Sequence, residues 1–89
     1  MKTFEMKVKK NTIPKQLASS IIRCLKDDEV GNIKINYIGD KASGTTVKAL
    51  ALVTEILGDE IEFNIKIKQQ HISTEDGLRT LMEWLITKK

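Results

Sequence analysis

The chain has 89 residues, of which 40% are hydrophobic and 30% are charged, an ordinary composition for a globular protein. This length leaves room for one hydrophobic core, so we expect a single domain over residues 1–89. No apolar run approaches the roughly 20 residues of a membrane helix, and charges alternate where a secretory signal would be apolar. These features exclude a helical membrane protein and predict a cytoplasmic location with no membrane partner.

Basic residues are concentrated near the start of the chain. The net charge is only +3, yet seven lysines and arginines precede residue 27 against the single acid Glu5, and an acidic run follows at residues 27–29. Such asymmetry attracts phosphate backbones, although surface lysines also keep small domains soluble. Nucleic acid is therefore a candidate partner, and a solvated basic face is the alternative.

Three elements are expected in the first half of the chain. Residues 4–9 alternate between apolar and charged side chains, which predicts a half-buried strand. Residues 11–13 offer capping side chains before Pro14, and apolar residues then recur at helical spacing, which predicts a helix from Pro14 to Lys26. Residues 33–37 alternate again and meet a turn at Ile38-Gly39, which predicts a second strand.

The second helix is expected from Thr45 to about Leu57, with Ser43 and Gly44 as caps and Gly58 closing it. Its apolar residues point in several directions, which indicates a second burying partner beyond its own sheet. We therefore expect a homodimer. The clean alternation over residues 60–68 predicts a third strand.

The last segment, residues 74–87, has two local interpretations. Residues 73–76 resemble a helix start, and Leu78, Leu81 and Leu85 fit helical spacing. Against this, Asp76-Gly77 is a hairpin turn signal directly after a strong strand. Local signals alone leave helix and strand open.

Specific residues resemble the stage V sporulation protein S family, within the Alba-like superfamily. The resemblance rests on residues 14–22, on Ile38-Gly39 and the Val-Lys-Ala sequence of residues 47–51, and on the closing stretch 76–86. It implies an α/β domain of order β-α-β-α-β-β, with a four-stranded mixed sheet and two helices packed on one face. It also implies a strand, not a helix, at the C-terminus, because pairing with a neighbouring strand can outweigh local propensity.

The resemblance implies a DNA or RNA partner held through the backbone. Alba-like proteins place lysines of the first loop against the nucleic acid and lay the arm between the last two strands along a groove. Glu75 and Asp76 at the arm's tip weaken the second expectation. The candidate nucleic-acid-binding residues are Lys9, Lys10, Lys15, Lys41, Lys48, Lys66, Lys68 and Arg79.

Residues 39–46 have the glycine spacing of a phosphate-binding loop between a strand and a helix. The motif fails for nucleotide hydrolysis, because Thr45 stands where the phosphate-binding lysine is needed. What remains is a helix N-terminus that can hold an anion, or simply a turn that needs glycine. The candidate residues of this turn are Gly39, Ser43, Gly44 and Thr45.

Catalytic and metal chemistry find little support in the sequence. His71 is the only histidine and Cys24 the only cysteine, and neither has partners at ligand or catalytic spacing. We expect no enzyme activity, no cofactor and no metal. Two alternatives to nucleic-acid binding stay open: a protein-interaction module that regulates a developmental or defence pathway through a protein partner, and small-ligand sensing at the Gly39 turn.

Overall fold

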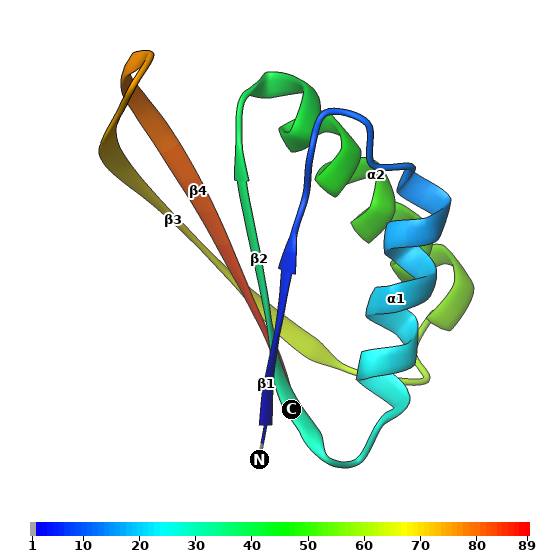
Figure 1. Cartoon of the computed structure of the whole chain (residues 1–89). Coiled ribbons are helices and arrows are strands. Elements are labelled where there is room, and N and C mark those ends of the chain that lie inside the picture. Colours follow the sequence, from blue (N-terminus) through cyan, green and yellow to red (C-terminus); the bar gives the residue numbers. More distant parts are fainter. Residues whose placement is uncertain (1) are drawn as a thin grey trace.

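The computed structural model describes residues 2–89 and consists of one sheet with two helices on one of its faces (Figure 1). The elements in chain order are β1 (Lys2–Lys7), α1 (Pro14–Lys26), β2 (Val30–Ile38), α2 (Asp40–Leu57), β3 (Phe63–Thr74) and β4 (Gly77–Lys88). The sheet order is β1-β2-β4-β3, with β1 parallel to β2 and the other neighbours antiparallel. The expected four-stranded mixed sheet with two helices on one face is therefore confirmed.

The C-terminal segment is a strand, as the family resemblance implied. Gly77 has a φ of 109°, which suits glycine at the hairpin turn. From there β4 runs between β2 and β3 and pairs with both. A helix would satisfy the backbone groups of this segment alone, whereas the central strand also satisfies those of its two neighbours. Tertiary pairing therefore overrides the local helical spacing.

The start of α2 differs from the prediction. The helix begins at Asp40, and its cap is Gly39, with a φ of 95° that favours glycine. The Ser43 amide already donates to the Gly39 carbonyl at 3.2 Å. Ser43 and Gly44 therefore lie inside the helix, and the prediction that they cap it was wrong.

The other element boundaries agree with the prediction to different extents. The limits of α1 and the closure of α2 at Gly58 are confirmed. The capping residue of α1 is Ile13, whose apolar side chain cannot form a capping hydrogen bond. The Thr12 hydroxyl accepts from the Lys9 amide at 2.9 Å and does not cap the helix. The strand predicted over residues 60–68 begins only at residue 63 and continues to residue 74.

The core lies between the helices and the centre of the sheet. Ile33, Ile35 and Tyr37 of β2 point toward the helices and are at most 2% exposed. Small residues on the helices, such as Ala18 and Ala49, let the two layers approach closely. Burial of these side chains is the main stabilising contribution to the fold.

A short hydrogen-bonded chain crosses this core. The Trp84 indole N–H donates to the Tyr37 hydroxyl at 2.9 Å, and that hydroxyl also lies 3.0 Å from the Ser43 hydroxyl. The chain joins β4, β2 and the first turns of α2. It therefore satisfies buried polar groups and joins the first turns of α2 to the sheet.

Candidate nucleic-acid interface

Three connections meet at one end of the molecule: the β1–α1 loop, the β2–α2 turn and the β3–β4 hairpin (Figure 1). Because β1 and β2 are parallel, their C-terminal ends lie together. β4 is antiparallel to β2, so its start lies at the same end. The topology thus gathers residues from distant parts of the sequence at one end of the sheet.

Lys9 and Lys10 lie on the β1–α1 loop, and both are exposed. The loop is tied down at several points. The Val8 amide donates to the Asn36 carbonyl at 2.9 Å, and the Thr12 amide donates to the Lys9 carbonyl at 3.1 Å. The two lysines are therefore carried by a hydrogen-bonded turn rather than by a loose segment.

Lys15 and Lys48 are brought together by the packing of the helices. Lys15 lies in the first turn of α1 and Lys48 lies on α2, yet both line a shallow, mostly apolar groove between the two helices. Glu55 lines the same groove. This pair of lysines therefore extends the basic surface of the first loop across to α2.

Lys41 lies in the first turn of α2, next to the Gly39 cap. A helix N-terminus carries partial positive charge, but Asp40 occupies the same turn and opposes a second anion. Thr45 is 9% exposed and its hydroxyl donates to the Lys41 carbonyl at 3.1 Å. The predicted phosphate-binding turn is therefore much shorter than residues 39–46, and Ser43, Gly44 and Thr45 belong to the helix instead.

Lys66 and Lys68 lie on the face of the sheet that the helices leave open. Their neighbours on β3, Ile65 and Ile67, stand opposite Ile86 and Trp84 on the helix side. Successive residues of a strand alternate between faces, so the two lysines point the other way. They are not gathered with the lysines of the first loop.

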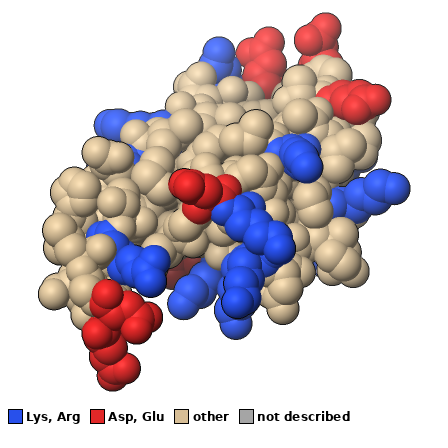
Figure 2. All heavy atoms as spheres, turned by 90° about the horizontal axis from the view of Figure 1, so that it is seen from above, with Lys and Arg blue, Asp and Glu red and all other residues tan. Residues whose placement is uncertain are grey.

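Arg79 lies at the start of β4 and lines a hollow together with Gly39, Asp40 and Ser43. Its guanidinium is 4.0 Å from the Asp76 carboxylate at the hairpin tip. The β3–β4 hairpin thus contributes one positive and one negative side chain to this end of the molecule. Figure 2 looks down on the end and shows basic side chains around its middle, with acidic ones mostly toward two opposite margins.

Nearly the whole chain matches a known protein family. The family model described as stage V sporulation protein S matches residues 4–89. The chain belongs to this family. No curated protein sequence matches it. Among solved structures, Alba from Thermoplasma volcanium is similar, with a TM-score of 0.62 at 10% sequence identity, over 97% of this chain and 99% of that chain. This likeness shows that the family member has an Alba-like fold.

Sequence reasoning missed a charged cluster on the open face of this sporulation protein S family member. The Lys34 ammonium lies 3.1 Å from the Glu83 carboxylate and 3.7 Å from the Glu5 carboxylate. The hydrogen bond and charge of Glu83, followed by those of Glu5, raise the pKa of Lys34 above its usual value. Cross-strand register, which composition does not reveal, brings these residues together, so that Lys34 is paired with two carboxylates on the open face.

Two further observations concern residues 2–89 of the family member. Neither helix there is long and apolar enough to cross a bilayer. The same residues contain no group of three side chains suited to holding a metal ion.

Proposed function

We propose that this family member is a small, non-enzymatic regulatory protein that binds the backbone of DNA or RNA. The observation that carries the proposal is the position of Lys9 and Lys10 on the β1–α1 loop and of Lys15 and Lys41 in the first turns of α1 and α2. Both helices begin at the same end of the molecule (Figure 1). Phosphate neutralisation by such lysines releases counterions and supplies affinity without sequence selectivity.

Contacts to bases have a minor part in this proposal. Tyr37 and Trp84 are buried in the core, and Phe63 is partly buried against it. Only Phe4 is substantially exposed, and it lies beside α1 on the first strand. The aromatic stacking surface of a single-strand binder is therefore lacking in residues 2–89, which favours binding through phosphates.

A titration across salt concentrations tests the proposal. Fluorescence anisotropy with labelled duplex DNA, single-stranded DNA and RNA is measured between low and physiological salt. We expect affinity to fall steeply with salt, and Lys9→Ala/Lys10→Ala to reduce the logarithmic salt slope by about 2. The matched control is Lys26→Ala/Lys89→Ala, which removes the same charge at the opposite end and leaves the slope unchanged. The absence of binding to all three nucleic acids at low salt and micromolar protein would overturn the proposal.

We further propose that the protein is a homodimer. Ile65 and Ile67 of β3 lie on the helix side of the sheet but are 41% and 51% exposed, because neither helix extends over this strand. Val47 and Ile56 of α2 are 53% and 64% exposed. Val47 and Ile56 are nine residues apart and therefore lie on opposite sides of α2. A second copy that covers Ile65 and Ile67 together with one of these sides supplies the additional burying partner expected from the sequence of α2.

Sedimentation equilibrium tests the dimer. We expect the unmodified protein to sediment as a dimer and Ile65→Glu to sediment as a monomer, because a charge at an apolar interface lacks a partner. Ile13→Glu is the control, since Ile13 is similarly exposed at 50% but lies before α1. A monomeric unmodified protein, or an Ile65→Glu variant that remains dimeric, would contradict the assignment.

A further inference from the structure

The face of the sheet that the helices leave open carries charged side chains from all four strands. Residues that stand opposite each other on paired strands share a face. The register therefore places two neighbouring rows across this face, one of Lys7, Asn36, Glu83 and Lys68 and one of Glu5, Lys34, Leu85 and Lys66. Within residues 2–89 no helix covers either row, because both helices pack on the opposite face (Figure 1).

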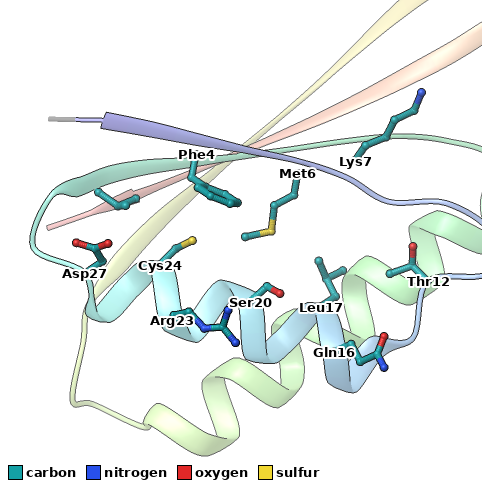
Figure 3. Close-up of a pocket in the computed structure, with 11 residues that line it drawn as sticks. Phe4, Met6, Lys7, Thr12, Gln16, Leu17, Ser20, Arg23, Cys24 and Asp27 are labelled. Carbon is teal, nitrogen blue, oxygen red and sulfur yellow. The ribbon is translucent and has the colours of Figure 1, made fainter.

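Lys7 belongs to this open face and not to the groove between β1 and α1. Figure 3 shows Phe4 and Met6 pointing from β1 into that groove, which Cys24 of α1 also lines. Lys7 points the other way, as alternation along a strand requires. Lys7 is also the last residue of β1, two positions before Lys9. The open face therefore adjoins the β1–α1 loop.

One lysine pairs with both acidic side chains of the strands. Glu5 and Glu83 are the only acidic residues in the four strands. The Lys34 ammonium lies between them, 3.7 Å from the Glu5 carboxylate and 3.1 Å from the Glu83 carboxylate. The exposed lysines of this face that form no ion pair within residues 2–89 are Lys7, Lys66 and Lys68. The uncompensated charge of the open face is therefore positive.

The character of the open face favours a polyanion as its occupant. A second copy that presented the same face would bring like charges together. The hollow on this face has a volume of about 630 Å³ and is broad and shallow, which suits the surface of a polymer better than an enclosed small molecule. Because the face adjoins the β1–α1 loop with Lys9 and Lys10, a nucleic acid bound at that loop can continue across it.

We propose that the open face of the sheet is a second nucleic-acid-binding surface, on which Lys7, Lys66 and Lys68 contact backbone phosphates. This surface rests on the proposed function and extends it from the β1–α1 loop across all four strands. Lys7 on β1 and Lys68 on β3 are three strand spacings apart, about 14 Å, so one nucleic-acid segment reaches both. Lys34 acts indirectly, because its pairing with both carboxylates keeps them from repelling the phosphates.

Fluorescence anisotropy across salt concentrations, with labelled duplex DNA, single-stranded DNA and RNA, tests this surface. We expect Lys66→Ala/Lys68→Ala to reduce the logarithmic salt slope by about 2, as Lys9→Ala/Lys10→Ala does at the β1–α1 loop. A lower slope for the loop variant alone would overturn binding at the open face and leave the proposed function standing. No binding by the unmodified protein would overturn the proposed function, and this surface with it.

Two controls accompany the titration. Lys26→Ala/Lys89→Ala removes the same charge away from the open face and should leave the salt slope unchanged. Polyglutamate, an acidic polypeptide, tests the other class of polyanion. Binding of polyglutamate through Lys66 and Lys68, without binding of any nucleic acid there, would assign the face to an acidic protein and overturn the proposal.

A gain in affinity tests the part assigned to the two carboxylates. Glu5→Gln/Glu83→Gln removes both acidic charges from the open face and frees Lys34. Asp28→Asn/Glu29→Gln removes two acidic charges between α1 and β2, at the other end of the molecule. At about 0.1 M salt, where the Debye length is about 10 Å, we expect at least about a threefold gain for the first variant and less than about 1.5-fold for the second. Equal gains would contradict binding at this face.

Two adjacent glutamines give a readout on the unmodified protein. Gln70 stands opposite Leu81 and lines the hollow on the open face. Gln69 stands opposite Met82, which packs against the core on the helix side. In a proton–nitrogen correlation spectrum, we expect short duplex DNA or single-stranded RNA to shift the side-chain amide signals of Gln70 and Asn36 and to leave that of Gln69 in place. Signals that shift only in the β1–α1 loop would overturn the proposal.

Discussion

The centre of the sheet and its outer strand β3 have the same alternating pattern but different surroundings. On β2, Ile33 and Ile35 are at most 1% exposed beneath the helices, whereas on β3, Ile65 and Ile67 are 41% and 51% exposed. Both pairs point to the same side of the sheet. Alternation therefore specifies which face a side chain occupies, and the second layer decides whether that face is buried.

The largest expected difference between the two regions concerns these isoleucines. Ile35→Ala leaves a cavity in the core and should lower the free energy of unfolding by about 2–5 kcal/mol. Ile67→Ala removes half-exposed surface and should cost at most about 1 kcal/mol, with a loss that depends on protein concentration if β3 lies in the dimer. Urea denaturation at two protein concentrations measures both values. Equal losses would show that β3 is covered as fully as β2.

A second difference concerns hydrogen bonds in the two regions. Tyr37→Phe leaves the Trp84 indole N–H without its acceptor and should cost about 1–3 kcal/mol. Thr80→Val removes the exposed contact at 3.3 Å between Thr80 and His71 on the hairpin and should change stability by less than about 0.5 kcal/mol. Trp84 is the only tryptophan, so its emission reports the first change directly. A neutral Tyr37→Phe variant would contradict a structural role for the buried chain.

Two glycines near the start of α2 should respond to substitution by alanine with stability changes of opposite sign. Gly39 has a φ of 95°, so Gly39→Ala should lower stability by about 1–2 kcal/mol. Gly44 lies within α2, and an added Cβ there meets nothing within 4 Å. Gly44→Ala should raise stability by about 0.5–1 kcal/mol. Thermal unfolding followed by circular dichroism distinguishes the opposite signs, and destabilisation by both changes would contradict the observed start of α2.

The smallest expected effect concerns a thiol at the margin of the covered region. Burial, followed by the charge of Asp27, raises the pKa of Cys24 above its usual value. The neutral thiol is thus favoured in the folded state. Its contribution to stability is complete below the unfolded pKa of about 8.5 and declines as the pH rises above that value.

Reaction with Ellman's reagent at pH 8 tests this protection. Cys24 is 8% exposed, so we expect it to react at least about tenfold more slowly than a thiol on the uncovered strand, as in Cys24→Ser/Gln69→Cys. Comparable rates would show that the groove beside Cys24 opens freely.

Much of the fold was predictable from residues alone. Pro14 and the following apolar spacing set the limits of α1, and Gly58 marked the end of α2. The start of α2 was not predictable, because local signals favoured Ser43 and Gly44 as caps, whereas the helix begins at Asp40 and Ser43 contacts Tyr37 of β2 from within it. Local signals in the last segment fitted a helix at least as well as a strand. Only the family resemblance favoured the strand that the structure contains.

The candidate interface was predictable in part. The order of the elements sufficed to expect Lys9 and Lys10 on a loop before α1. The position of Lys48 beside Lys15 requires the packing of two helices. The placement of Lys66 on the open face requires the strand register.

The local periodicity, the turn residues and the basic bias of the first part of the chain can be read from the amino-acid sequence, because they depend on neighbouring residues. Which apolar faces are covered follows from the tertiary fold alone. It placed α1 beside the edge of β1 to form a groove, and it left Ile65 and Ile67 of β3 uncovered. The physical reason is that burial and groove shape depend on contacts between distant elements, which no local pattern encodes.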